Sequence, residues 1–281
     1  MNIMFWNTNC QKGNENKFDE MLKAIIELVA DNNIDLLVLA EYHPEISNLC
    51  NEVNMSGRKH YVPLPNIGDC KRIKGIFKNN FNVIPVQGQE HYMIVKVETT
   101  YYTLLVAMIH GISKLFSTQK EQELSMWEFH HDIVTHESNL LRKNTIVIGD
   151  FNINPFETAC IGAGYMHAIP YIEEVHRQTR TVNGKEYVKF YNPTWKFLGN
   201  RGVPYSTYHY DNSGKVDNFY WNVFDQVLIR PSLIPAFDES KLGIISRTKN
   251  HVLTKQNGKP NKTKYSDHLP LFCILKEEMI L

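Results

Sequence analysis

A chain of 281 residues can form one large domain or two small ones, and it is long enough to bury a core without disulfide or metal staples. Hydrophobic residues make up 43% of it and charged residues 21%, which excludes disorder or low complexity over most of the length. The 30 basic and 30 acidic residues cancel, which argues against nucleic-acid binding through overall charge but leaves room for a local basic patch.

The first elements in the chain are predicted to be a strand, a helix and a second strand. Residues 2–6 form a short apolar strand, and residues 11–16 form a polar loop with a glycine. Residues 17–32 carry apolar side chains at the three-and-four spacing of an amphipathic helix. Residues 35–40 are apolar nearly throughout, as expected for a strand that is covered on both faces.

The middle of the chain predicts several strands and one long helix, whereas residues 43–72 show no pattern that assigns them to an element. The expected strands are 75–77, 82–86, 92–97 and 101–109. Thr118 and Glu121 match a capping box, which predicts a helix start. The apolar positions that extend this helix are Leu124, Trp127, Ile133, Val134 and Leu141.

The next strand is the most distinctive stretch of the sequence. Residues 145–148 are apolar and mostly β-branched, which predicts a buried strand that ends at Gly149. Asp150 and Asn152 follow at the strand's carboxyl end and, two residues apart, face the same side of an extended backbone. They can act together on a cation or an attacking water, or they can form an Asx-type turn that satisfies backbone groups.

The last part of the chain alternates between irregular segments and two strands. Residues 156–222 are rich in Tyr, Trp, Asn and Gly and are expected to form loops and short elements. Strands are predicted at 224–229 and 271–275. Between Ser246 and Ser266 the chain has six Lys or Arg residues and no acidic residue, which predicts an exposed basic loop. Since no linker or repeat divides the chain, we expect a single domain over residues 1–281 with mixed sheets.

The sequence also predicts the cellular compartment of the protein. The five cysteines are scattered and form no Cys-x-x-Cys pair, which favours a reduced compartment over a disulfide framework or a thiolate zinc site. The first residues do not resemble a secretion signal, and no apolar run approaches the roughly 18 residues of a membrane span. We therefore expect a cytoplasmic protein without a membrane span.

Acidic, amide and imidazole side chains recur where the predicted strands begin or end. These residues are Asn7, Glu41, His110, Asp150, Asn152, Asp225, Asp267 and His268. The sequence has no Gly-x-Ser-x-Gly nucleophile motif, and Gly162-Ala163-Gly164 is not followed by the residues of a phosphate-binding loop. The remaining chemistry is oxygen ligation of a hard divalent cation together with His–Asp proton transfer.

These motifs, in this order, resemble those of the endonuclease/exonuclease/phosphatase superfamily, which has the deoxyribonuclease I-like fold. The matching segments are Trp6-Asn7, Leu39-Ala40-Glu41, His110, Gly149-Asp150-Phe151-Asn152, Asp225 and Ser266-Asp267-His268-Leu269-Pro270. The resemblance extends over residues 6–270 and implies a four-layer α/β/β/α sandwich with two packed mixed β-sheets. It also implies hydrolysis of phosphate esters with Mg²⁺, or Mn²⁺ in its place.

Roles for individual residues also follow from the resemblance. Glu41 corresponds to the main metal ligand, assisted by Asn7 and Asp267. Asp150 would orient or deprotonate the attacking water, and Asn152 would hold a phosphate oxygen. The resemblance further pairs His268 with Asp225, assigns a donor role toward the phosphate or leaving group to His110, and leaves open which group is the base.

The sequence departs from one branch of the superfamily. Asn9 stands where abasic-site endonucleases carry aspartate, and His110 stands where they carry tyrosine, so the chain is closer to the branches of deoxyribonuclease I, sphingomyelinases, inositol phosphatases and tyrosyl-DNA phosphodiesterases. The leucine that often follows the histidine in those branches is absent after Gly111. Further candidates for substrate contact are Asn9, Arg177, Trp195, Tyr208 and His209.

The sequence thus predicts a divalent-metal-dependent phosphoesterase, most simply a nuclease that acts on DNA or RNA. The nuclease preference rests on the basic loop, on aromatic residues in 191–220 that could stack bases or pack a loop, and on the absence of a membrane-targeting segment. One alternative is a phosphatase or phosphodiesterase for lipid head groups or small phosphoesters. Another is a catalytically inactive binding module with the same fold.

Overall fold

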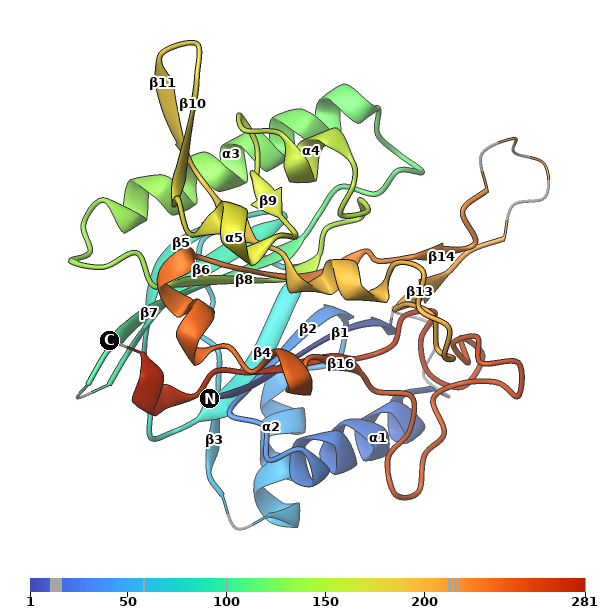
Figure 1. Cartoon of the computed structure of the whole chain (residues 1–281). Helices are drawn as coiled ribbons and strands as arrows, with labels where there is room; N and C mark the ends of the chain where they lie inside the picture. Colours follow the sequence, from blue (N-terminus) through green and yellow to red (C-terminus); the bar gives the residue numbers. More distant parts are fainter. Residues whose placement is uncertain are drawn as a thin grey trace.

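Two large mixed β-sheets pack face to face in the computed structural model, and helices cover the outer face of each sheet (Figure 1). The structure describes residues 1–10, 17–57, 59–99, 101–211, 214, 216 and 218–280. The loop expected at residues 11–16 lies outside the described residues. The four layers confirm the α/β/β/α sandwich that the sequence predicts.

The first sheet has six strands in the order β16-β17-β1-β2-β4-β3. In that order they are Gly243–Ile244, Leu271–Ile274, Asn2–Cys10, Leu36–Tyr42, Ile73–Lys78 and Tyr61–Pro63. β1 and β2 are parallel, and the other neighbours are antiparallel. Helices α1 (Phe18–Asp31) and α2 (Ile46–Ser56) cover its outer face, and α2 and β3 occupy the segment that the sequence pattern left unassigned.

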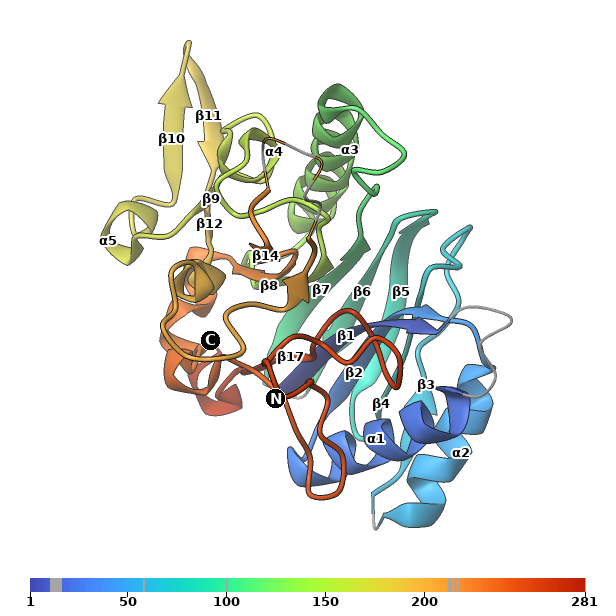
Figure 2. The same cartoon turned by 90° about the vertical axis from the view of Figure 1, so that its right-hand side faces the viewer.

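The second sheet has seven strands in the order β5-β6-β7-β8-β15-β12-β9. In that order they are Asn82–Gln89, Tyr92–Glu98, Thr103–His110, Thr145–Asp150, Asp225–Ile229, Phe190–Tyr191 and Ala168–Ile169. The pairs β7·β8 and β12·β9 are parallel, and the others are antiparallel. Helices α3 (Gln119–Glu137) and α4 (Thr158–Ile161) lie on its outer face (Figure 2).

The remaining elements are short, as expected for the irregular part of the chain. They are α5 (Ile172–Val175), β10 (Thr179–Val182), β11 (Lys185–Val188), β13 (Tyr208–His209), β14 (Trp221–Asn222) and the 3₁₀ helices Pro193–Phe197, Pro231–Ala236, Glu239–Lys241 and Glu277–Met279. β10 and β11 form a hairpin that projects from the sandwich (Figures 1 and 2). Within the described ranges, no helix combines the length and the apolar character required to cross a bilayer.

The core explains why the central strands are apolar on both faces. In β1, Ile3 and Phe5 point into the space between the two sheets, whereas Met4 and Trp6 pack against the helices outside. β7 divides in the same way, with Val106 between the sheets and other residues facing α3. Each central strand is therefore buried on both sides, and polar residues are tolerated mainly at the strand ends.

The buried face of α3 differs from the sequence prediction. The capping box at Thr118 and Glu121 is confirmed, but the helix ends at Glu137 and not at Leu141. Leu124 and Trp127 are exposed, and the buried face instead consists of Gln122, Ser125, Met126, Phe129, His130, Ile133 and Glu137. Polar residues can occupy this face because they have buried partners, such as the backbone carbonyl that accepts from the Gln122 side chain.

Two buried histidines make the fold sensitive to acid. Burial lowers the pKa of His130 to about 3, and burial likewise lowers the pKa of His167 to about 4. Both pKa values are below the unfolded value of about 6.5, so the stabilisation is complete above pH 6.5 and is lost as the pH falls, when the unfolded chain binds protons that the folded chain excludes. At pH 5, each of the two histidines should lower the free energy of unfolding by about 2 kcal/mol relative to its value at neutral pH.

The measurement is urea unfolding at pH 7.5 and pH 5 for the wild type and for His130→Gln. The variant should lose about half of the histidine-dependent difference, because glutamine does not titrate. His60→Gln, at an exposed position, should retain the full difference. An equal pH dependence in the wild type and His130→Gln would contradict the assignment.

Candidate active site

Three predicted site residues lie side by side at one end of the seven-stranded sheet. His110 ends β7 and Asp150 ends β8, and because these strands are parallel the two residues are paired in register. β15 runs antiparallel to β8 and begins with Asp225, which is opposite Asp150. The strand pairing thus places an imidazole and two carboxylates, which are 40 or more residues apart in sequence, in one row across the sheet.

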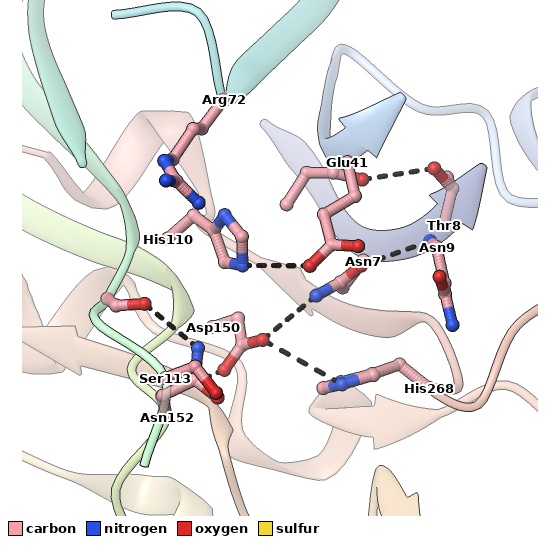
Figure 3. A network of polar contacts seen from close by, with 12 residues as sticks. Asn7, Thr8, Asn9, Glu41, Arg72, His110, Ser113, Asp150, Asn152 and His268 are labelled. Atoms are coloured by element: carbon pink, nitrogen blue, oxygen red, sulfur yellow. Dashed lines mark hydrogen bonds and ion pairs between the residues drawn. The ribbon is translucent and has the colours of Figure 1, made fainter. Parts of the chain in front are cut away.

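The six-stranded sheet brings its own polar residues to the same end of the sandwich. β1 continues through Asn7 to Cys10, beyond the predicted end at residue 6, and its register with β2 shifts between Asn7 and Cys10. The amide Nδ2 of Asn7 donates to Oδ2 of Asp150 at 3.0 Å, which joins the two sheets at the site (Figure 3). Trp6 Nε1 donates to the backbone carbonyl of His268 at 2.9 Å and so holds the segment before β17 against β1.

A polar pocket of about 520 Å³ opens where the two sheets meet. Nine of the predicted residues line it, namely Asn7, Asn9, Glu41, His110, Asp150, Asn152, Tyr208, Asp267 and His268. Asp225 is fully buried behind the wall of the polar pocket, in contact with His268. The convergence that the sequence motifs predict therefore exists in the structure.

His268 and Asp225 form a buried imidazole–carboxylate couple. Nδ1 of His268 donates to Oδ2 of Asp225 at 2.9 Å, and its Nε2 is 3.8 Å from Oδ2 of Asp150. Burial opposes charge on the imidazole, but the carboxylates of Asp225, Asp150 and Asp267 outweigh burial and raise the pKa of His268 to about 10. Burial raises the pKa of Asp225 above its usual value, and the neighbouring His268 partly offsets this increase.

Asp150 is held by donors on both of its oxygens. Oδ1 accepts the backbone N–H of Asn152 at 2.8 Å, and Oδ2 accepts from Asn7. The hydrogen bond from the N–H of Asn152 to Oδ1 forms the Asx-type turn that the sequence offered as an alternative to a site. Asp150 makes this turn and also lines the polar pocket. Asn152 donates through Nδ2 to the carbonyl of Gly111 at 2.9 Å, which fixes its side chain beside the polar pocket.

Glu41 and His110 face each other across the pocket. Nε2 of His110 lies 3.2 Å from Oε1 of Glu41, and Figure 3 shows Arg72 on the same side of the site as His110. Nδ1 of His110 is buried and has no hydrogen-bond partner within the part of the chain that the structure describes. The imidazole is therefore oriented mainly by Glu41 and by its backbone position at the end of β7.

The backbone at the site is unusual at several positions. Asn9, Glu41 and Asn152 have positive φ angles of 44°, 50° and 54°. Such conformations cost of order 1–3 kcal/mol for residues other than glycine and persist where the surroundings enforce them. Gly149 allows a close approach, since a Cβ there would lie 2.0 Å from the carbonyl oxygen of Ile109. Three of the eight residues other than glycine that have a positive φ in the described part of the chain thus line the polar pocket.

Two groups of side chains could hold a cation. Among the described residues, Asp150, Asp225 and His268 have potential ligand atoms within 4.8 Å of one another. The His268–Asp225 hydrogen bond already uses two of these groups, and Asp225 does not line the polar pocket. The second group consists of Asn7, Glu41 and Asp267, which all line the polar pocket, as Asp150 does; Asp267 Oδ1 accepts from Asn9 Nδ2 at 3.0 Å.

Three of the predicted substrate contacts lie elsewhere. Arg177 and Trp195 do not line the polar pocket, and the ring of His209 packs edge-on against Trp221 at 5.0 Å. Of the five substrate candidates, Asn9 and Tyr208 are placed at the site. The other three were chosen from composition, which does not show where a loop side chain points.

Sequence analysis also missed the basic residues at the site. Lys71, Arg72 and Lys74 line the polar pocket at the start of β4, whereas no lysine or arginine of the basic loop 246–266 does so. Arg72 forms an ion pair with Glu90 at 3.0 Å, and Lys74 Nζ donates to the carbonyls of His43 and Pro44. The available signal was the run of three cations within four residues before a predicted strand.

Comparison with known proteins gives a match at the level of structure. No protein-family model matches the chain, and no curated protein has a significantly similar sequence. TDP2 from D. rerio complexed with a single-strand DNA product has a TM-score of 0.57 at 17% identity, covering 97% of both chains. The 3'-5' exonuclease NExo from Neisseria meningitidis has a TM-score of 0.56 at 15% identity, covering 98% of this chain and 99% of that chain.

An endonuclease/exonuclease/phosphatase family protein from Bacteroides thetaiotaomicron gives a TM-score of 0.56 at 11% identity, covering 97% of this chain and 96% of that chain. Matches of nearly full length to several proteins with one architecture establish the fold. This chain therefore has the fold of the endonuclease/exonuclease/phosphatase superfamily.

Proposed function

We propose that the protein is a divalent-metal-dependent phosphoesterase, and specifically a nuclease that hydrolyses phosphodiester bonds of DNA or RNA. The observation that carries the proposal is the convergence of Asn7, Glu41, His110, Asp150 and His268 from both sheets on one polar pocket. Two carboxylates, two imidazoles and an amide held this closely are suited to charge neutralisation and proton transfer at a phosphate.

Each side chain at the site has a separate role in the proposed reaction. The imidazolium of His268 donates toward a phosphoryl oxygen and neutralises charge as it develops there. Asp150 orients the attacking water and accepts its proton, since both of its oxygens are held in place and the residue lines the pocket. Asn152 and His110 bind the other phosphate oxygens or the leaving group, as the sequence resemblance implies.

The donor set fits a hard cation. Glu41, Asn7 and Asp267 offer carboxylate and amide oxygens on the pocket wall, and Mg²⁺ prefers few protein oxygens together with water. A bound Mg²⁺ or Mn²⁺ would polarise the phosphoryl group and offset its negative charge. On this proposal Glu41 is the principal ligand, and its contact with His110 keeps the carboxylate aimed into the pocket.

The preference for a nucleic acid comes from the surroundings of the polar pocket. Lys71, Arg72 and Lys74 provide positive charge beside the proposed scissile phosphate, where further phosphates of a strand would lie. The neighbours in structure include a protein bound to a single-strand DNA product and NExo bound to a product DNA hairpin. A small phosphoester has no second phosphate to use this charge. The cytoplasmic location stays a prediction.

The test is hydrolysis of a substrate panel with Mg²⁺, with Mn²⁺ and with a chelator. The panel contains single- and double-stranded DNA, RNA, a phospholipid head-group ester and a small phosphomonoester. We expect cleavage of a nucleic acid that stops in the chelator and returns on adding the metal. Cleavage limited to the small or lipid esters would instead indicate the phosphatase alternative, and nucleic-acid cleavage that persists in the chelator would contradict the metal assignment.

A further inference from the structure

A second hollow, of about 690 Å³, adjoins the polar pocket and has a different character. The two share Ser113, Leu115, Asn152 and Tyr208 as walls, so a substrate bound at one reaches directly into the other. We call the second hollow the aromatic groove, after Phe156, Phe219, Phe224 and Tyr208. No residue of the proposed reaction other than Asn152 lines the aromatic groove, and the resemblance assigns no other role to its walls.

The aromatic rings form a path that begins at the proposed site. The ring of Tyr208 lies 4.5 Å from the imidazole of His268 and stacks on Phe224 at 5.2 Å. Further out, Phe156 and Phe219 meet edge to face at 5.4 Å. Phe156 is 41% exposed and Phe219 is 55% exposed, so their faces are open to a ligand although burial would be the usual place for such side chains.

The aromatic groove has fewer basic residues on its walls than the polar pocket has. Lys114 is the lysine that lines it, and its ammonium group is paired with Glu157, which also lines it. The neutral amides of Asn152, Asn154 and Asn222 line it as well, and they are held in place by the protein: Asn154 Nδ2 donates to Asn222 Oδ1 and Asn152 Nδ2 donates to the carbonyl of Gly111, both at 2.9 Å. The positive charge is instead at Lys71, Arg72 and Lys74, which line the polar pocket and not the aromatic groove.

We infer that the aromatic groove binds the unpaired nucleobase of the nucleotide next to the scissile phosphate. This inference rests on the proposed nuclease function and specifies its substrate as single-stranded or frayed nucleic acid. A nucleobase is flat, uncharged and polar at its edge, which matches aromatic faces with neutral amides beside them. The next phosphates of the strand then contact Lys71 and Arg72 on the other side of the polar pocket.

Base pairing and base stacking within a duplex explain why the aromatic groove favours a single strand. A base inside a duplex has both faces stacked on its neighbours and its edge paired, so it cannot place a face on Phe219 without leaving the helix. A free strand avoids that cost. An acyl chain would also bury aromatic surface, and the phospholipid head-group ester of the substrate panel tests that alternative directly.

The test compares two single-stranded oligonucleotides that differ at one nucleotide. One has normal bases, and the other has an abasic tetrahydrofuran residue next to the scissile phosphate. For the wild type, kcat/KM should fall by roughly tenfold to a hundredfold on the abasic substrate, the range of base–aromatic stacking. Phe219→Ala should lose a similar factor on the normal substrate and little on the abasic one, because the contact is already missing there.

Two control variants separate base binding from other effects. Arg72→Ala should lower kcat/KM by the same factor on both oligonucleotides, since a phosphate contact does not depend on the base. Tyr171→Ala removes another exposed aromatic side chain, 66% exposed and outside both hollows, and should change neither value. Melting temperatures of all variants check that each is folded.

The outcomes distinguish the inference from the proposed function. Equal effects of Phe219→Ala on normal and abasic strands, or equal rates on single strands and blunt duplexes, would overturn the base-binding inference while the nuclease survives. If only lipid or small phosphoesters are cleaved, both fail. If turnover is absent altogether, fluorescence anisotropy of a labelled oligonucleotide decides the binding: tighter binding of the normal than of the abasic strand, abolished in Phe219→Ala, supports the inference, and equal binding refutes it.

Discussion

Replacing Asp150 with asparagine is expected to lower kcat by roughly 10²–10⁴-fold, the contribution of a positioned acid–base group. The amide keeps the size of the carboxylate, but it cannot accept a proton from water at neutral pH. Both oxygens of Asp150 accept hydrogen bonds, from Asn7 Nδ2 and from the N–H of Asn152, and an amide can satisfy only one of these donors, so the variant should also lose about 1–3 kcal/mol of stability while remaining folded. The measurement is steady-state hydrolysis of the best substrate of the panel, with KM determined separately.

The matched control is Asp19→Asn, an exposed aspartate in the first turn of α1. It should retain full activity and lose less than about 1 kcal/mol of stability. Activity of Asp150→Asn within a factor of two of the wild type would contradict the proposed reaction. It would favour the alternative that the fold serves as a binding module.

Replacing Glu137 with glutamine is expected to reduce the free energy of unfolding by about 3–5 kcal/mol, because it leaves a buried guanidinium without its counterion. Arg230 Nε donates to Oε1 of Glu137 at 2.7 Å and a second nitrogen donates to Oε2 at 3.0 Å, and neither side chain is exposed by more than 1%. The Arg230 guanidinium also lies 3.6 Å from the centre of the Phe190 ring. The melting temperature should fall by roughly 6–10 °C.

Two comparisons test this interpretation of Glu137. Glu137→Met combined with Arg230→Met should be more stable than Glu137→Gln alone, since no unpaired charge is then buried. Glu20→Gln, which removes a surface ion pair to Lys264 at 2.9 Å, should leave the melting temperature nearly unchanged, because solvent screens the pair. A loss for Glu137→Gln as small as for Glu20→Gln would show that the buried pair contributes little.

The residues that support the proposed preference for a nucleic acid differ between the sequence and the structure. The nuclease preference first rested on the basic loop 246–266, but the positive charge at the site comes from Lys71, Arg72 and Lys74. Of the aromatic residues in the segment 191–220, Tyr208 lies at the polar pocket and Trp195 does not. The proposed preference for a nucleic acid therefore rests on residues that only the tertiary structure shows to lie at the site.

Local patterns were sufficient for the elements that are regular and for the residues at their ends. The apolar run before Asp150, the amphipathic spacing of α1 and the capping box of α3 all predicted elements that the structure contains. These signals succeed because they depend on backbone periodicity and on neighbouring residues. The resemblance of the ordered polar motifs to the superfamily then implied the sandwich and most of the residues of the polar pocket.

Tertiary structure alone decided which side chains meet. The register of β7, β8 and β15 places His110, Asp150 and Asp225 in one row, and a local pattern does not encode strand pairing over such separations. The inner face of α3 includes polar side chains that have buried partners, whereas the apolar side chains of Leu124 and Trp127 are exposed. The sequence by itself therefore determined the fold and the chemical groups of the site, whereas long-range packing determined the basic residues beside it and the aromatic groove, because these depend on the direction of loop side chains.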